Sequence, residues 1–330
     1  MIKVFTIVGA RPNFIKVDRE LPGQVLVHTG QHYSYGMNQT FFKERKLPKP
    51  KWNLGCKGEE VGKMIDKLKA LFKKEKPSLV LVFGDTNSSL AGALAAAYCN
   101  IKIAHVEAGL RSYRTDMPEE INRKIIDHLS TVLFCPNARS QMALFKEGIK
   151  DNVHIVGDPS FDAMADFLPV KRKKNYKKYH LLTLHRNFNA DNKEFLKDVF
   201  GAIEDSEERV IFPIHPRTKK NIKQFGLKMP KNIKTTSPRT YSEMLSLLSN
   251  CNKVLTDSGG VQREAYWMQK PVIILREDTE WTEILVNGAG MLANNKEEIL
   301  RGIKEFNAKI VPPPVFGANK KIRDIIYKYV

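Results

Sequence analysis

Paired cysteines are absent from this 330-residue sequence. Its four cysteines, Cys56, Cys99, Cys135 and Cys251, lie far apart and form no C-x-x-C pair. A zinc site and a disulfide framework both need thiols at characteristic spacings, so the sequence predicts neither. We expect ordinary buried thiols.

Long hydrophobic runs and the common nucleotide-binding fingerprints are also missing. No apolar run reaches the roughly 18 residues that a membrane-spanning helix needs. The first residues, MIKVFTIVG, indicate a strand rather than a signal peptide. The turn that follows has neither G-x-G-x-x-G nor G-x-x-x-x-G-K-[ST]. The sequence therefore predicts a cytoplasmic protein with no membrane segment, no nicotinamide cofactor and no metal site.

Negative charge is scarce relative to positive charge. Lysine and arginine number 54 against 36 aspartates and glutamates, a formal net charge of +18. That charge would suit nucleic-acid binding, but the lysines are spread along the chain and no RNP, zinc-finger or helix-turn-helix signature is present. The densest basic stretch, residues 171–180, is interpreted as a solvated linker or helix face. We expect no nucleic-acid partner, whereas a positive field would attract an anionic small substrate.

What the sequence does contain is a regular alternation of strand and helix patterns, which is typical of α/β proteins with parallel sheets. The length favours two domains over one. We expect Rossmann-like domains at residues 1–160 and 161–314 that face a cleft, and a final helix in residues 315–330 that packs back on the first domain. The expected strands are IKVFTIVG, QVLVHTG, VLVFGD, IKIAHVE, TVLFCP and VHIVGD in the first half, then YHLLTLH, RVIFPIH, KVLTDS and KPVIILR.

Acidic residues follow two of these strands. Asp85 ends VLVFGD and Glu107 ends IKIAHVE, with a predicted crossover helix between them. Glu119 follows Pro118, which suits the first position of a helix. Carboxylates at such strand ends line the ligand crevice of α/β folds, so we expect these three acids to converge on one cleft. The inward stripe of the helix after Pro118 is expected to consist of Ile121, Ile125, Ile126 and Leu129.

The first domain also offers basic and polar groups next to strands. The segment VGARPNFIKV places Arg11 and Lys16 around a helix start, where Arg11 is a candidate for a phosphate or sugar contact. A plain surface arginine is the alternative. Gln31 and His32, in TGQHY, follow another expected strand.

The most specific phosphate signal is TDSGGVQREA, residues 256–265. Ser258, Gly259 and Gly260 follow a strand and precede a helix, so their backbone N–H groups can approach a diphosphate closely. Glu264 comes one turn later, where its carboxylate could accept both ribose hydroxyls. The alternative is a Gly-Gly turn that serves only the chain reversal.

Histidines end two strands of the second domain. His185 and Arg186 follow YHLLTL, and His215 follows RVIFPI. A lone histidine is more often structural than catalytic, but two at strand ends of one domain favour an anion-binding face.

Together these segments resemble the non-hydrolysing UDP-N-acetylglucosamine 2-epimerase family. The matching pieces, in the family's order along nearly the whole chain, are GARPNFIK, TGQHY, FGDTNSSLA, HVEAGLRS, PEEINR, HRNF, DSGGVQREA and KPVIILREDTEWTE. The resemblance implies a glycosyltransferase-B-like pair of Rossmann domains, a UDP-sugar held mainly by the second domain, no cofactor and a homodimer. It also implies elimination of UDP to 2-acetamidoglucal and re-addition on the opposite face, which needs both an acid and a base.

The resemblance assigns a role to each candidate residue. Acid/base work falls on Asp85, Glu107 and Glu119. Basic groups of the cleft fall on Arg11, Lys16, Arg123 and His185, and the UDP-binding turn on Ser258, Gly259, Gly260 and Glu264, with Arg276 nearby and the uracil stretch at residues 236–244. A second, activating substrate site would use Gln31, His32, Arg186 and His215. Ser34 stands where activated members carry glutamine, which predicts weak or absent activation.

Other functions stay open at this point. Trp281 and Thr282 replace the arginine and proline of the family's usual D-T-T-E-R-P-E segment. A similar T-E-W pattern occurs in members that act on UDP-GlcNAc and in members that act on UDP-2,3-diacetamido uronic acids. The substrate is therefore either UDP-GlcNAc or a related sugar such as UDP-2,3-diacetamido-glucuronic acid. A UDP-sugar glycosyltransferase shares the fold but would not need three carboxylates in the first domain. A non-enzymatic nucleotide-sugar sensor would leave those acids without a task.

Overall fold

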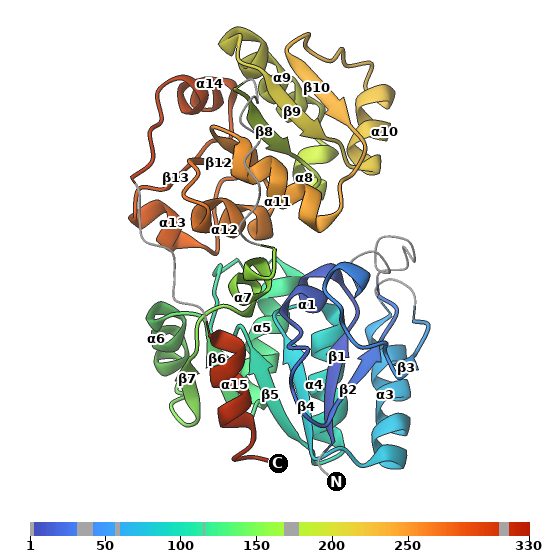
Figure 1. Cartoon of the computed structure of the whole chain (residues 1–330). Helices are drawn as coiled ribbons and strands as arrows, with labels where there is room; N and C mark the ends of the chain where they lie inside the picture. Colours follow the sequence, from blue (N-terminus) through green and yellow to red (C-terminus); the bar gives the residue numbers. More distant parts are fainter. Residues whose placement is uncertain (1–2, 32–41, 57–59, 115, 168–177, 310–316) are drawn as a thin grey trace. The chain divides into compact units, whose positions relative to one another are not determined.

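The computed structural model describes residues 3–31, 42–56, 60–114, 116–167, 178–309 and 317–330, with the side chain of Arg11 excepted. The chain forms two compact units (Figure 1). Unit 1 comprises Met1–Asp166 and Val315–Val330, and unit 2 comprises Phe167–Pro314. Each unit is an α/β body built on one parallel sheet, which confirms the expected fold class.

Unit 1 contains a seven-stranded sheet with the order β3-β2-β1-β4-β5-β6-β7, in which every pair is parallel. Its elements are β1 (Val4–Val8), α1 (Arg11–Lys16), β2 (Gln24–His28), β3 (Trp52–Asn53), α3 (Val61–Glu75), β4 (Leu79–Phe83), α4 (Asn87–Tyr98), β5 (Lys102–Val106), α5 (Pro118–Leu129), β6 (Val132–Cys135), α6 (Ala138–Lys146), β7 (Val153–Ile155), α7 (Pro159–Ala165) and α15 (Ala318–Ile326).

The central strands of unit 1 are buried along their whole length because helices cover both faces of the sheet. β1 (VFTIV) and β4 (LVLVF) show no exposed position. From β1 the chain adds β2 and β3 on one side of the sheet and then β4 to β7 on the other, so the direction in which strands are added reverses between β1 and β4. Right-handed crossovers therefore place α1 on one face and α3, α4 and α5 on the other. The carboxyl ends of β1 and β4 flank this reversal, where α/β folds bind ligands.

The alanine-rich helix α4 packs closely on this sheet. A Cβ atom on Gly92 would lie 3.0 Å from side-chain atoms of both Ile7 and Val82. α4 packs between α3 and α5, and the shared core includes Phe5 and Phe72. On the α1 side, the C-terminal helix α15 packs against α7 (Figure 1), where Asp162 accepts hydrogen bonds from the backbone at the start of α15.

Unit 2 contains a six-stranded parallel sheet with the order β10-β9-β8-β11-β12-β13. Its elements are β8 (His180–Thr183), α8 (Asn187–Ala190), α9 (Lys193–Ser206), β9 (Val210–Pro213), α10 (Pro216–Gln224), β10 (Ile233–Thr236), α11 (Tyr241–Asn250), β11 (Val254–Thr256), α12 (Gly259–Trp267), β12 (Val272–Ile274), α13 (Thr282–Val286), β13 (Gly290–Leu292) and α14 (Lys296–Lys304). The reversal here lies between β8 and β11.

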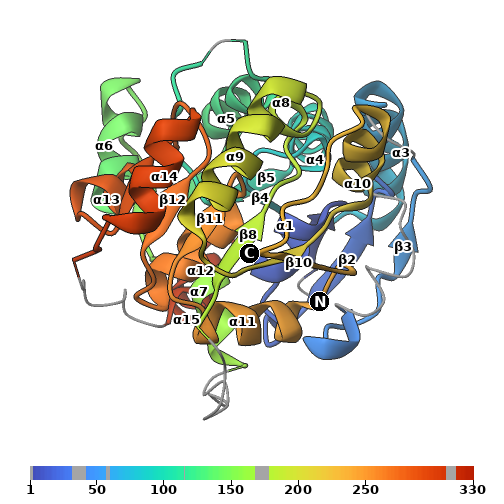
Figure 2. The same ribbon diagram turned by 90° about the horizontal axis from the view of Figure 1, so that it is seen from above.

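The core of unit 2 lies between its sheet and the helices α9 and α14, which lie side by side (Figure 2). Leu182, Val199, Phe212, Leu255 and Ile273 are among its buried members. All ten strands expected from the sequence are present, and three more, β3, β10 and β13, join them at sheet edges.

The cysteines behave as ordinary thiols. Cys56, Cys135 and Cys251 are buried and Cys99 is half-buried, and all four are free. Burial raises the pKa of the thiols of Cys135 and Cys251 to about 12. In the described part of the chain, no helix is both long and apolar enough to cross a membrane.

Candidate active site

In unit 1, Asp85 stands just beyond β4 on a tight turn. Gly84 makes this turn with φ of 59°. Residues with a Cβ atom adopt this backbone conformation only at a cost in free energy. A Cβ atom there would also lie 2.7 Å from Oε2 of Glu107. Glycine therefore lets the Glu107 carboxylate approach the backbone directly before Asp85, and the first two predicted acids are neighbours.

Glu107 holds this place through a strained backbone. Its φ is 74°, which is unusual for a residue other than glycine and costs of order 1–3 kcal/mol. The backbone N–H groups of Glu107 and Ala108 both donate to the carbonyl of Phe134 at 3.0 Å, which fixes the turn after β5. The carboxylate is 9% exposed and ion-pairs with Nζ of Lys16, the buried last residue of α1. Lys16 and Glu107, two of the residues predicted for the cleft, thus contact each other.

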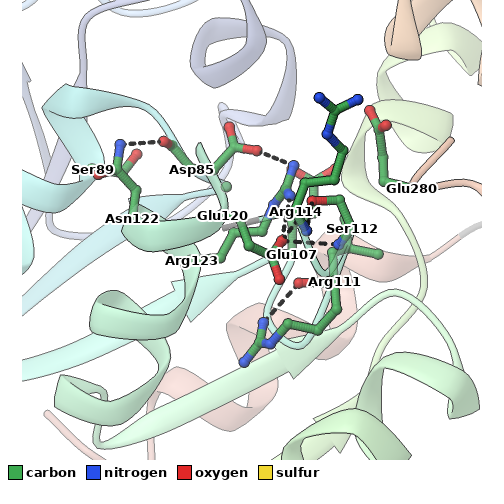
Figure 3. Close-up of polar contacts among 12 residues, drawn as sticks. Asp85, Ser89, Glu107, Arg111, Ser112, Arg114, Glu120, Asn122, Arg123 and Glu280 are labelled. Carbon is green, nitrogen blue, oxygen red and sulfur yellow. Dashed lines mark hydrogen bonds and ion pairs between the residues drawn. The ribbon is translucent and has the colours of Figure 1, made fainter. Parts of the chain in front are cut away.

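Arg123 of α5 connects Asp85 to a further acid. Its guanidinium lies 2.5 Å from Oδ2 of Asp85 and 3.1 Å from Oε2 of Glu120 (Figure 3). Glu120 also accepts hydrogen bonds from the backbone N–H and hydroxyl of Ser112, both at 2.9 Å. Burial favours the neutral form of Glu120, but the bonds from Ser112 and the charge of Arg123 outweigh it, and the pKa of Glu120 is lowered.

Glu119 and the rest of α5 differ partly from the expectation. Pro118 is the first residue of α5, and Glu119 follows it, half-buried, in the acidic first turn. The predicted inward stripe was wrong at Ile121, which is 49% exposed. The face of α5 that turns inward is largely polar, because it meets the charged groups at the strand ends rather than the apolar core alone. Its buried residues are Glu120, Asn122, Arg123, Ile126 and Asp127.

Gln31 is the remaining candidate of unit 1 whose side chain lies in the described part of the structure. Gln31 follows β2, and its Oε1 accepts hydrogen bonds from the backbone N–H of Ser88 at 3.0 Å and from its hydroxyl at 2.6 Å. Gln31 therefore helps to fix the first turn of α4. Arg11 is the first residue of α1, and its side chain lies outside the described part of the structure. His32 lies outside the described residues altogether.

A buried charged network beneath the two acids was not anticipated. His105 of β5 is 0% exposed, with Nε2 3.0 Å from the carbonyl of Gly84 and Nδ1 2.7 Å from Oδ1 of Asp127. Asp127 also lies 2.7 Å from Arg111, which binds Glu147 through two hydrogen bonds of 2.7 and 2.6 Å. The sequence carried one signal for it: a histidine inside an apolar strand needs a partner, because a buried polar group without one is costly.

In unit 2, an aspartate organises the end of β8. Asp257 follows β11, its side chain is 0% exposed, and it accepts the backbone N–H of His185 at 2.9 Å and of Arg186 at 2.8 Å. The ring of His185 approaches it at 3.2 Å. Burial raises the pKa of Asp257, but the bonds and charge of His185 and the bond from Arg186 outweigh burial, so its pKa is lowered. In the sequence Asp257 lies in the TDSGG segment, where its residue type alone does not indicate this role.

The two predicted histidines of unit 2 do lie together. The ring centroids of His185 and His215 are 6.0 Å apart. His215 is the N-cap of α10 and accepts the backbone N–H of Arg217 at 3.3 Å. Desolvation, followed by the charges of His185 and Arg217, lowers the pKa of His215. The unit therefore presents two imidazoles and Arg186 at adjacent strand ends.

The predicted phosphate turn begins a helix as expected. Ser258 is the N-cap of α12, and its hydroxyl accepts the N–H of Val261 at 3.4 Å. Gly259 and Gly260 are the first two residues of α12, and Glu264 is buried one turn later. A Cβ atom on Gly259 would lie 2.6 Å from Oε1 of Glu280. Glycine at this position therefore lets the Glu280 carboxylate lie close to the start of α12.

Arg276 and the aromatic residues of the following loop complete this region. Arg276 is 5% exposed and binds Glu280 at 2.9 Å and Asp278 at 3.2 Å. Trp281, the residue that departs from the family's usual arginine, is 4% exposed and stacks under the guanidinium of Arg263 at 4.0 Å. The described residues contain no group of three or more histidine, cysteine, aspartate or glutamate side chains arranged to hold a metal ion.

Comparison with known proteins places the chain in a family. The family model described as UDP-N-acetylglucosamine 2-epimerase matches residues 17–326. The chain belongs to the UDP-N-acetylglucosamine 2-epimerase family. A protein of Methanococcus maripaludis named as a homolog of UDP-N-acetylglucosamine 2-epimerase is 46% identical over 93% of each chain. The resemblance drawn from the sequence motifs is confirmed.

Two further relatives bear on structure and substrate. The crystal structure of Methanocaldococcus jannaschii UDP-GlcNAc 2-epimerase in complex with UDP-GlcNAc and UDP has a TM-score of 0.87 at 40% identity, and covers 99% of this chain and 100% of the other. The Pseudomonas aeruginosa UDP-2,3-diacetamido-2,3-dideoxy-D-glucuronate 2-epimerase is 38% identical, with 91% of this chain and 90% of that protein covered. Relatives of this chain are therefore named for different UDP-sugars.

Proposed function

We propose that this protein interconverts UDP-GlcNAc and UDP-ManNAc as a non-hydrolysing 2-epimerase. The observation that carries the proposal is the placement of Asp85 and Glu107 at neighbouring strand ends of unit 1, each ion-paired, with Glu119 in the first turn of α5. Family membership supplies the reaction class. Inversion at C2 needs a base and an acid on different faces of the sugar, which such a set of carboxylates can provide.

The proposed chemistry begins with loss of UDP. The C2 proton is not next to a carbonyl, so direct removal would be slow. A carboxylate takes this proton as the bond between C1 and the diphosphate oxygen breaks, which gives 2-acetamidoglucal and UDP. UDP then adds back to C1 while an acid delivers a proton to the opposite face of C2. Asp85, Glu107 and Glu119 are the proposed proton-transfer groups.

In this proposal unit 2 binds the nucleotide. Ser258, Gly259 and Gly260 present the start of α12 to the diphosphate, and Glu264 accepts the ribose hydroxyls. His185, Arg186, His215 and Arg276 supply positive or hydrogen-bonding groups for the charge that develops on the leaving diphosphate. Residues 236–244, at the end of β10 and start of α11, are the proposed uracil contact.

The experiment uses the purified protein with UDP-GlcNAc in deuterated water, without added NAD or metal. UDP-ManNAc should form and carry deuterium at C2, because an acid/base group exchanges its proton with solvent. Turnover with retained protium at C2 would contradict the elimination route. No turnover of UDP-GlcNAc at all would contradict the proposal.

A second substrate has specific support. The P. aeruginosa relative, which is 38% identical to this chain, is named for a diacetamido-glucuronate sugar. Offering both UDP-sugars in one NMR assay discriminates the two, since the preferred one will epimerise first.

The family resemblance also supports a homodimer in the cytoplasm that serves polysaccharide biosynthesis. Light scattering coupled to gel filtration tests whether the protein is a dimer.

A further inference from the structure

The hydrogen bonds around His105 define which hydrogens its ring carries. The carbonyl of Gly84 can only accept, so Nε2 must donate to it across 3.0 Å. An ionised carboxylate can also only accept, so Nδ1 must donate to Asp127 across 2.7 Å. A neutral ring has one hydrogen and would leave a lone pair facing an oxygen on one side.

The surroundings favour a charged ring. Asp127 is fully buried, and its Oδ2 lies 2.7 Å from the guanidinium of Arg111 and accepts the backbone N–H of Gly109 at 3.2 Å, contacts that suit an ionised carboxylate. The network around His105 contains the buried Asp127, the partly exposed Glu147, whose side chain is 24% exposed, and one arginine, Arg111. A protonated His105 would make the sum of these four charges zero. The nearby thiol of Cys135 stays neutral, because burial and the Asp127 charge raise its pKa to about 12.

The same bonds fix the position of a proposed catalytic group. The Gly84 carbonyl belongs to the peptide that leads directly into Asp85, and the Gly84 N–H donates to the Val106 carbonyl at 2.9 Å. His105 therefore holds one side of this turn while Asp127 ties it to α5, the helix that carries Arg123. Asp127 also accepts the N–H of Gly109 at 3.2 Å, two residues after Glu107.

We propose that His105 is a doubly protonated positioning residue that fixes the Gly84–Asp85 peptide, and so the Asp85 carboxylate, for proton transfer. The proposal rests on the proposed function, because the placement of Asp85 matters for turnover only if Asp85 takes part in it. A displacement of about 1 Å in a reacting group can cost about 100-fold in rate. His105 itself contacts no substrate in this account.

Two substitutions separate the bonds of His105. His105→Asn keeps a donor near the position of Nδ1 for Asp127 and loses the bond to Gly84, whereas His105→Gln keeps a donor near the position of Nε2 for Gly84. We expect His105→Asn to lower kcat about 100-fold with KM and UDP affinity changed less than about 2-fold, and His105→Gln to recover most of kcat. His128→Gln, at an exposed histidine of α5, is the matched control. Equal kcat for the Asn variant and the wild type, or equal losses in both variants, would overturn the proposal.

A spectroscopic test needs no variant. In protein with ¹⁵N-labelled histidine at pH 7, the signals of His105, recognised by slow exchange of its ring hydrogens, should show both nitrogens protonated. A neutral ring would refute the inference even if both variants fail to fold. Failure of the wild-type protein to epimerise would instead refute the proposed function, and the ring signals would still decide the protonation of His105.

Discussion

Asp85 and Asp257 occupy equivalent places in the two units, yet their surroundings are opposite. In each sheet the direction in which strands are added reverses once, and each aspartate follows a strand at that point, β4 in unit 1 and β11 in unit 2. The Asp85 side chain is 26% exposed and faces a side chain, Arg123. The Asp257 side chain is 0% exposed and binds two backbone N–H groups and an imidazole. The two aspartates have the same position in their folds. The residues around each carboxylate decide whether it remains accessible for chemistry or binds the backbone.

The helices that follow the two aspartates differ in the same sense. In α4 the first turn is filled by protein groups: Gln31 accepts the N–H of Ser88, and Thr86 accepts the N–H of Ser89. In α12 the Ser258 hydroxyl accepts the N–H of Val261 in the same way, but the first two residues of the helix are Gly259 and Gly260. Two glycines let a diphosphate approach the backbone at the helix start more closely than the side chains at the start of α4 allow. The comparison supports proton transfer in unit 1 and nucleotide binding in unit 2.

The largest expected effect separates these roles in unit 1. Glu107→Gln should lower kcat by roughly 100-fold or more, because the amide cannot exchange a proton as a carboxylate does. UDP affinity, measured by calorimetry, should stay near the wild-type value. Asp151→Asn, at an exposed position of unit 1, should leave both quantities unchanged. Loss of UDP binding in Glu107→Gln would break the proposed division between the units.

The next largest effect compares the two aspartates directly. Asp257→Asn should reduce the stability of unit 2 by about 3 kcal/mol, because backbone donors that bound a buried charge would face an amide. Asp85→Asn should cost about 1 kcal/mol or less in unit 1, because its partly exposed ion pair is worth less. In a Trp52→Phe background the remaining tryptophans, Trp267 and Trp281, report urea unfolding of unit 2 by fluorescence. For unit 1, circular dichroism can follow Asp85→Asn, and equal losses at the two aspartates would contradict the comparison.

A third, smaller effect belongs to the nucleotide-binding unit. Ser258→Ala and Glu264→Gln should each weaken UDP binding about 10-fold, the loss expected for one hydrogen bond to a charged or sugar group. At saturating substrate kcat should change less than in Glu107→Gln. Glu204→Gln, on the exposed face of α9, is the control. Unchanged UDP affinity in the Glu264 variant would remove that residue from the proposed ribose contact.

The sequence predicted the central strands well for a physical reason. Strands such as β4 are buried on both faces, and they appear as unbroken apolar runs. β3, β10 and β13 were missed because they are short edge strands with partly exposed residues: β3 has two residues and β10 reads IKTT. Edge strands carry a weaker apolar pattern, and periodicity detects them poorly.

The polar interior was harder to predict than the core. In α5 the stripe of isoleucines suggested an inward face that included Ile121, whereas Glu120 and Asp127 are buried there and Ile121 is exposed. Hydrophobic periodicity assumes an apolar partner surface, and the partners of α5 include Ser112 and His105. The position of a residue at a strand end could be predicted because it follows from the order of residues along the chain. The different roles of Asp257 and Asp85 could not, because the sequence does not show how deeply each side chain is buried.

The last expected effect concerns acid stability, to which buried carboxylates of both units contribute. Glu120 and Asp127 in unit 1 and Asp257 in unit 2 have lowered pKa values in the folded protein. Unfolded aspartate and glutamate take up protons near pH 4, so the unfolded state binds protons first as pH falls. The stabilisation from these groups is complete above about pH 4.3 and is lost as pH drops through their folded pKa values.

Histidines add a weaker change of the same sign at higher pH. His180 and His215 of unit 2 and His154 of unit 1 have lowered pKa values, with burial as the first cause in each. Their contribution is complete above about pH 6.5 and declines below it, since unfolded histidine then binds the extra proton. The urea midpoint should therefore fall slightly from pH 7 to pH 5 and steeply below pH 4. Asp127→Asn should start from a lower midpoint and show a shallower acid decline, and a decline as steep as that of the wild type would show that Asp127 does not carry this dependence.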